Sequence, residues 1–170
     1  MLSCLRNIAI KNKRSLFRNG YYGYESQCLC SDVRHRHVTK VRVEWRDLDP
    51  MNHVNNCAFF AFFENARIQV FQDQLGLDMS LKPSGLAPVI SHTECRYLKQ
   101  VRLPDELEIR TSVEGVEPER AQYKHKYECF STSQQEVVAI GSATIVMLNF
   151  DGKSASRAPL SDDFVRKLTS

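Results

Sequence analysis

Two different periods of apolar and polar residues run along the chain, and each predicts a different element. Residues 39–47 alternate at every second position, with Val41, Val43 and Trp45 on one face and charged residues on the other, as in a half-buried β-strand. From residue 57 to residue 75 this alternation stops, and apolar residues surround the first two turns. A helix that is apolar on all sides is usually a buried one. We therefore expect a strand followed by a buried helix that ends near Gly76.

Beyond residue 88 the pattern indicates strands alone. Turn-like stretches rich in Pro, Gly, Ser and Gln separate four strand-like segments, which are 89–98, 107–113, 121–130 and 137–150. The last segment is apolar on both faces, so we expect it inside the sheet and under the helix. The order β-α-β-β-β-β predicts the α+β class. Residues 151–170 are charged, and we expect a partly disordered tail there.

Between the first strand and the helix lies a polar segment that folding alone does not require. Residues 47–56 hold two carboxylates, one imidazole and three carboxamides. Pro50 disfavours helical geometry at Asp49, so the chain turns out of the strand at this point. Asn55 or Asn56 can cap the helix, which brings Asp49 beside the positive helix end. Such a place favours negative charge that develops during a reaction.

The residues of this segment resemble a known family. Asp49-Pro50-Met51-Asn52-His53-Val54-Asn55-Asn56, followed by Phe59-Phe60 and Glu64, is similar to the Asp-x-x-x-His-Val-Asn-Asn signature of hot-dog-fold acyl-CoA and acyl-carrier-protein thioesterases, the 4-hydroxybenzoyl-CoA thioesterase superfamily. A second stretch, residues 96–107, resembles the segment by which that family passes from one strand to the next, with Gln100 and Pro104 in place of the usual Pro and Gly. The resemblance covers residues 38–150. It implies an antiparallel sheet wrapped around one long helix, and hydrolysis of a thioester to a free acid and a thiol.

The resemblance also implies roles for four residues. The family residue that matches Asp49 is the catalytic carboxylate, which acts as general base on water or attacks the thioester carbonyl directly. His53 is then available to orient Asp49 or water, or to polarise the carbonyl. The backbone amides of Asn55 and Asn56 are the expected oxyanion donors. The sequence does not decide whether Asp49 acts as general base or as nucleophile.

Three further residues are weaker candidates. Glu64 shares a helical face with apolar residues, and some relatives place a catalytic Glu on this helix; the alternative is an ordinary i,i+3 ion pair with Arg67. Lys99 and Arg102 lie next to an expected turn, where they can meet the phosphates of CoA. Nothing resembles a Gly-rich phosphate loop, a Ser-His-Asp arrangement or a metal cluster, so we expect neither metal nor cofactor.

Two other functional classes use the same fold. A non-catalytic hot-dog subunit of an organellar assembly would lose site residues, whereas Asp49 and His53 are both present. A hot-dog dehydratase or hydratase usually has His-x-Gly, but His53 is followed by Val54-Asn55-Asn56. A thioesterase acting on acyl-CoA or acyl-carrier protein is therefore the favoured interpretation. Relatives join sheets edge to edge, which implies a homodimer or a homotetramer.

Length and cysteine content set further limits. The chain has 170 residues, which suits one domain. No apolar run approaches the ~18 residues that a membrane span needs. The six cysteines are scattered, which does not indicate a disulfide framework. We expect Cys57, Cys95 and Cys129 to act as small hydrophobic residues in apolar elements.

The positive charge of the chain is concentrated at its start. The net charge is +3, but residues 1–37 hold seven Lys or Arg against two acids, and residues 38–170 hold 16 basic and 18 acidic residues. The domain is therefore not basic, which argues against nucleic-acid binding. Residues 1–24 mix basic and apolar side chains without any acid, as in a mitochondrial presequence. A plastid address or a plain basic tail on a cytoplasmic protein are the alternatives.

This charge pattern generates a first prediction. Residues 1–40 fused to a fluorescent protein should direct it to mitochondria, because a basic, acid-free, partly apolar start is what the import machinery accepts. Fluorescence microscopy measures the location. A matched fusion with Lys11, Lys13 and Arg14 changed to Glu should stay in the cytosol, and diffuse fluorescence of the unchanged fusion would contradict the targeting role.

Overall fold

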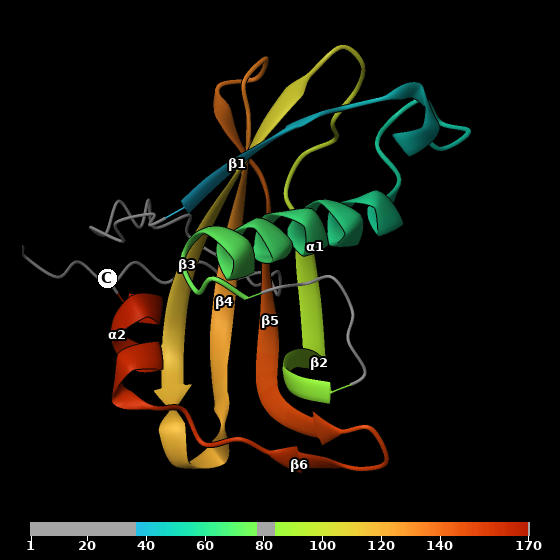
Figure 1. Ribbon diagram of the computed structural model, residues 1–170. Helices are drawn as coiled ribbons and strands as arrows, with labels where there is room; N and C mark the ends of the chain where they lie inside the picture. Colours follow the sequence, from blue (N-terminus) through green and yellow to red (C-terminus); the bar gives the residue numbers. More distant parts are fainter. Residues whose placement is uncertain (1–36, 78–83, 170) are drawn as a thin grey trace, which may run out of the picture. The chain divides into compact units, whose positions relative to one another are not determined.

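A computed structural model describes residues 37–77 and 84–169 of the chain. The expected targeting segment, residues 1–37, thus lies outside the described residues except for its last position, and its role stays a prediction. Figure 1 shows the elements in chain order. They are β1 (His37–Arg42), the 3-10 helix η1 (Trp45–Asp47), α1 (Asn56–Asp73), β2 (Ser84–Tyr97), β3 (Glu106–Glu117), the 3-10 helix η2 (Pro118–Arg120), β4 (Gln122–Ser131), β5 (Glu136–Asp151), β6 (Ala155–Arg157) and α2 (Asp162–Thr169).

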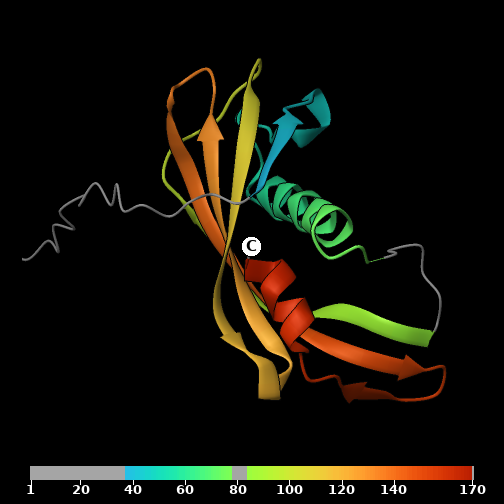
Figure 2. The ribbon, with the colours of Figure 1, turned by 60° about the vertical axis from the view of Figure 1, so that its left-hand side comes forward.

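One antiparallel sheet of six strands carries the fold. Its strand order is β1-β3-β4-β5-β2, and β6 adds to the end of β5. Helix α1 lies across one face of the sheet, and Figure 2 shows α2 on the same side. β5 pairs with β4 on one side and β2 on the other, which confirms its expected place inside the sheet. The architecture confirms the α+β class and the hot-dog arrangement.

The first strand is shorter than its alternation predicts. β1 ends at Arg42, which pairs with Glu106, the first residue of β3. The Val43 amide still donates to the Asp105 carbonyl at 3.0 Å, but β3 does not extend further to pair with the residues beyond Val43. The chain instead closes η1, where the Asp47 carboxylate accepts a hydrogen bond from the Glu44 amide at 2.8 Å. Trp45, expected on the buried face of the strand, is 83% exposed.

Helix α1 packs on the sheet through one face only. The buried residues of α1 are Phe59, Phe62, Phe63, Ala66, Arg67, Val70 and Phe71. Phe63 stacks on Tyr127 with ring centroids 4.8 Å apart, and a Cβ built on Gly141 would come within 2.5 Å of the Phe63 ring. The opposite face, including Ala61 and Glu64, is exposed. The expectation of burial on all sides is wrong for the single chain, because the sheet covers the helix from one side.

The C-terminal residues do not form the partly disordered tail that we expected. β6 pairs with β5 through residues 155–157, and α2 follows. Leu160 and Leu168 are buried, and Phe164 packs against Tyr123 with ring centroids 6.1 Å apart. These three residues of the C-terminal segment recur at intervals of four, which is helical spacing. The surrounding charges obscured this pattern in the sequence.

In the described part of the chain, no helix combines the length and the apolar character that a membrane crossing needs.

Polar side chains lie buried between α1 and the sheet. Arg67 Nη1 donates a hydrogen bond to the Tyr127 hydroxyl at 3.3 Å, and this hydroxyl lies 3.5 Å from His125 Nδ1. His125 is fully buried. Burial lowers the pKa of His125 to about 3, and the positive charge of Arg67 adds to this effect. The imidazole is therefore neutral in the folded protein at any pH above this value.

The neutral state of His125 makes stability depend on pH. In the unfolded chain its pKa is near 6.5, so between pH 6.5 and 3 the unfolded state binds the extra proton. The free energy of unfolding should therefore fall as pH falls, by about 2 kcal/mol from this group between pH 6.5 and 4.5. Urea unfolding of the parent and of His125→Phe at both pH values measures the difference.

His92, which is exposed, provides the matched control. His92→Gln should keep the pH dependence of the parent, while His125→Phe should lose about 2 kcal/mol of it. Equal pH dependence in the parent and in His125→Phe would contradict a buried neutral imidazole.

Candidate active site

A tight turn presents Asp49 and His53. Leu48 and Val54 form an antiparallel bridge at its base. Above it, the Asp49 amide donates to the His53 carbonyl and the Asn52 amide donates to the Asp49 carbonyl, both at 2.9 Å. Asn52 has φ +62°, a left-handed conformation that Asn adopts more easily than most residues. The local sequence thus closes the turn and fixes the two side chains together.

The carboxylate of Asp49 is held by three donors. Oδ1 accepts from the Met51 amide at 2.8 Å and from the His53 amide at 3.4 Å, and Oδ2 lies 3.0 Å from His53 Nδ1. Both side chains are largely covered, with 20% and 19% exposure for Asp49 and His53. Because a carboxylate only accepts hydrogen bonds, this contact assigns the proton of a neutral imidazole to Nδ1. Nε2 then has a free lone pair, and no hydrogen bond from the described part of the chain reaches it.

The start of α1 leaves the Asn56 amide without an acceptor among the described residues. Asn55 is the N-cap, and its side chain accepts from the Cys57 amide at 2.9 Å. Its own amide donates to the Asp47 carbonyl at 2.8 Å, so the Asn55 N–H is not free to meet an oxyanion as we expected. The Asn56 amide has no acceptor among the described residues. The turn of residues 47–55 accounts for this difference, because it brings the Asp47 carbonyl to the Asn55 amide.

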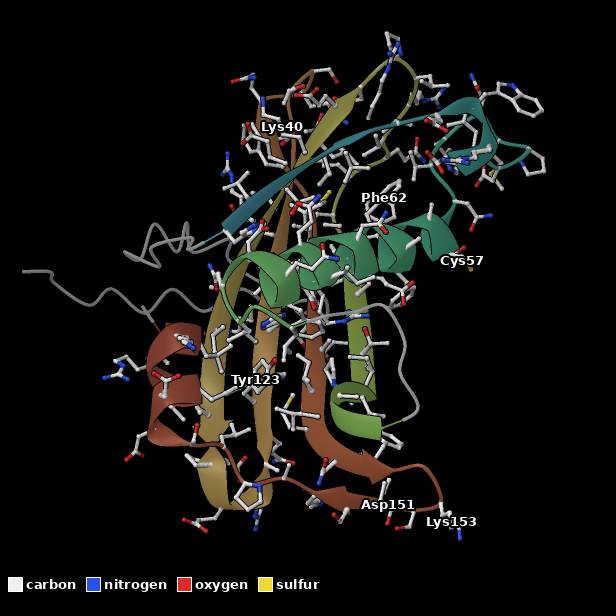
Figure 3. The ribbon with its side chains drawn as sticks, in the orientation of Figure 1. Lys40, Cys57, Phe62, Tyr123, Asp151 and Lys153 are labelled. Atoms are coloured by element: carbon white, nitrogen blue, oxygen red, sulfur yellow. The ribbon has the colours of Figure 1, made fainter. Side chains whose placement is uncertain are left out.

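The end of β2 and the loop after it hold the helix start. The Val54 amide donates to the Val101 carbonyl at 2.8 Å, and the Tyr97 hydroxyl donates to the Asn56 carbonyl at 2.9 Å. Tyr97 was not a candidate from the sequence, although it lies in the second stretch that resembles the family. Figure 3 marks this end of α1 with Cys57, which was expected to act as a small hydrophobic residue in an apolar element and is exposed. Cys129, in contrast, is buried as expected.

Glu64 does not join Asp49 and His53 within the chain. It lies eight residues beyond Asn56, and therefore about 12 Å further along the helix axis. Its side chain is 61% exposed, and Oε1 lies 3.8 Å from Arg67 Nη2. The apolar setting expected for this carboxylate is wrong, because its side of the helix faces away from the sheet. The geometry fits the weak i,i+3 ion pair that was the alternative.

Lys99 and Arg102 lie in the loop that contacts the site through Val101. Lys99 Nζ is 3.5 Å from Glu136 Oε2, and Arg102 is exposed. Both charges are therefore on the surface close to the segment that carries Val54. Among residues 37–77 and 84–169, no group of three His, Cys, Asp or Glu side chains is arranged to hold a metal ion.

Together these groups provide the parts of an acyl-transfer site. An imidazole with a free nitrogen is oriented by a carboxylate, as a general base requires. The Asn56 amide, which has no acceptor among the residues that the structure describes, lies at a helix N-terminus, where negative charge is stabilised. The arrangement is therefore able to activate water and to stabilise an oxyanion.

Comparisons with known proteins identify a family and similar folds. Residues 43–168 match the family model of the thioesterase-like superfamily. The Pseudomonas aeruginosa protein PA5185 is 22% identical with a TM-score of 0.68, over 78% of this chain and 88% of that one. A Thermus thermophilus thioesterase, whose structure was solved with coenzyme A and Zn, is 28% identical with a TM-score of 0.64, over 78% and 91%. A DHNA-CoA thioesterase from Staphylococcus aureus is 21% identical with a TM-score of 0.61, over 71% and 79%.

A curated relative is similar over a shorter region. The uncharacterized protein YsmA of Bacillus subtilis (strain 168) is 32% identical over 77 residues, which are 45% of this chain and 50% of YsmA. The match thus spans about half the length of that relative. The solved structures below 25% identity are similar in fold, and the family model carries the assignment to a class.

Proposed function

Because the chain belongs to the thioesterase-like superfamily, we propose that it hydrolyses acyl-CoA thioesters to a free acid and CoA. The observation that carries the proposal is the 3.0 Å contact between Asp49 Oδ2 and His53 Nδ1, close in the chain to the Asn56 amide, for which the described residues provide no acceptor. The coenzyme A in the Thermus thermophilus relative supports CoA as the carrier, rather than an acyl-carrier protein. Lys99 and Arg102 suit the phosphates of CoA by charge.

The proposed reaction is a hydrolysis in two steps. His53 Nε2 takes a proton from water, and the water oxygen attacks the thioester carbonyl carbon. The Asn56 amide donates to the oxyanion of the tetrahedral intermediate. The C–S bond then breaks, and the thiolate takes the proton from the His53 imidazolium. Asp49 keeps the imidazole in the required tautomer and stabilises its positive charge.

The geometry favours this route over direct attack by Asp49. Three donors already occupy the carboxylate, from the Met51 amide, the His53 amide and His53 Nδ1. A nucleophilic carboxylate would have to give up one of these hydrogen bonds before it reached the carbonyl carbon. Water activation by His53 needs no such change.

Exchange of the Asp49 carboxylate tests the site. Asp49→Asn keeps size and shape but presents either an NH₂ group or a weaker acceptor to His53 Nδ1, so kcat should fall by about 100-fold or more. His53→Ala should lower kcat by a similar factor, since the two side chains act as one unit. Steady-state release of thiol from acyl-CoAs of increasing length is the measurement, with melting curves to exclude misfolding.

Glu64→Gln is the matched carboxylate control. Its exposed side chain lies far along the helix, so kcat should stay close to that of the parent. Asp49→Asn with parental activity would remove the proposed site. A small effect of His53→Ala beside a large effect of Asp49→Asn would instead assign the base or the nucleophile to Asp49 itself.

We also propose that the working form is a homodimer joined along β2, with a tetramer as a pair of such dimers. β2 is an edge strand of 14 residues, and a long unpaired edge tends to pair with another strand. Leu86 and Val89 of this strand are exposed.

Two surface grooves of about 620 and 650 Å³ flank β1 and η1, and neither is lined by Asp49 or His53. A site shared between two subunits would provide the missing wall for the acyl group.

The two edges of the sheet allow a matched test of this dimer. Val89→Lys places a charge on the β2 edge, whereas Val38→Lys places the same charge on β1, the opposite edge, at a residue that is also exposed. Val89→Lys should shift the molecular mass from dimer to monomer in light scattering, because an edge lysine opposes strand pairing. Val38→Lys should remain dimeric. A monomeric parent with full activity would contradict both the interface and the shared site.

A further inference from the structure

Tyr97 connects the sheet to the first turn of α1. It is the last residue of β2 and pairs with Ala139 of β5. The amides of Leu98 and Lys99, directly after it, both donate to the Val138 carbonyl, at 2.8 and 3.0 Å. The backbone that carries Tyr97 is therefore held by the sheet on both sides of this residue.

The Tyr97 side chain is also held. Its ring packs edge-on against Phe59, with centroids 5.4 Å apart, and its hydroxyl donates to the Asn56 carbonyl at 2.9 Å. Partial burial raises the pKa of Tyr97, so the hydroxyl stays protonated and remains a donor near neutral pH. Tyr97 thus acts as a rigid support between the sheet and the helix start.

The contact falls on the peptide group that follows the unpaired amide. The peptide between Asn56 and Cys57 is fixed at both ends, since its N–H binds the Asn55 side chain and its carbonyl binds Tyr97. On the other side, the Asn55 amide is fixed by the Asp47 carbonyl. The Asn56 N–H lies between these two fixed groups. Its direction therefore depends on both of them.

We propose that Tyr97 is a positioning residue for thioester hydrolysis, whose hydroxyl keeps the Asn56 amide directed at the forming oxyanion. This inference rests on the proposed function. Tyr97 needs no contact with the substrate, because it acts through the peptide that it holds. An amide that is fixed before the reaction stabilises the transition state without reorganisation. An amide that moves would lose this benefit and still allow the substrate to bind, so the effect should appear in kcat and not in KM.

Tyr97→Phe isolates the hydroxyl, because it retains the ring that packs on Phe59. We expect kcat to fall about tenfold, less than the loss of a whole oxyanion donor, with KM within about twofold of the parent. Hydrogen exchange of the amides of residues 57–60, followed by mass spectrometry, should become about tenfold faster, since a released first turn opens more often. The parent protein and the variant are compared as full chains.

Tyr123→Phe is the matched control. Its hydroxyl is buried without a hydrogen-bond partner in the described part of the chain, and Figure 3 shows Tyr123 well away from the helix start at Cys57. Its kcat, KM and exchange at residues 57–60 should equal those of the parent.

The outcomes separate this inference from the proposed function. A parent that hydrolyses no thioester removes the proposed function, and the catalytic role of Tyr97 with it. An active parent whose Tyr97→Phe variant keeps its kcat overturns the inference alone, whatever the exchange shows. A lower kcat with unchanged exchange at residues 57–60 also overturns it, because the hydroxyl would then act in some way other than by holding the turn.

Discussion

The close contact between Phe63 and the sheet determines how helix α1, and with it the candidate site, is positioned on the sheet. The Phe63 ring stacks on Tyr127 and covers Gly141, so closely that even a Cβ at Gly141 would collide with it. The helix axis can approach the sheet to this distance only because β5 has a glycine there. Since α1 is rigid, this contact also fixes its first turn, about 10 Å away along the axis. Packing in the core thereby sets the position of the site.

The candidate site lies at the start of α1, where a helix leaves backbone amides without partners. The first amides of α1 have no partner within the helix, and the fold supplies acceptors for several of the amides at this helix start. Asp47 takes the Asn55 amide, and the Asn55 side chain takes the Cys57 amide. The Asn56 amide has no acceptor among the described residues, and it follows the Asp49 and His53 turn directly in the chain. At this helix start the Asn55 and Cys57 amides are therefore occupied, while the Asn56 amide is available as a hydrogen-bond donor.

The other half of α1 meets a different environment. Arg67 reaches under the helix to the Tyr127 hydroxyl, and the Tyr123 hydroxyl and His125 Nε2 are buried without a partner in the part of the chain that the structure describes. Unpaired buried polar atoms lower the free energy of unfolding. Apolar side chains of similar size would avoid this loss. The helix therefore combines a start that carries the candidate site with a second half whose packing is not optimised for stability.

The sequence by itself determined the fold class, the order of the first five strands and the long helix α1, and the place of the Asp49–His53 segment, because local periods and a short contiguous motif carry this information. It did not determine β6 and α2, where it predicted a partly disordered tail. It did not determine the end of β1 at Arg42, since that depends on where β3 begins. It also did not reveal that the Asn55 amide is occupied, that Glu64 faces away from the sheet, or that Tyr97 reaches Asn56. The end of β1 and the Tyr97 contact depend on residues far apart in the chain, the Asn55 contact depends on how the turn of residues 47–55 closes, and the direction of Glu64 depends on which face of α1 meets the sheet. A one-dimensional pattern carries no distances of this kind. Only the tertiary structure decided which polar groups were left free to act.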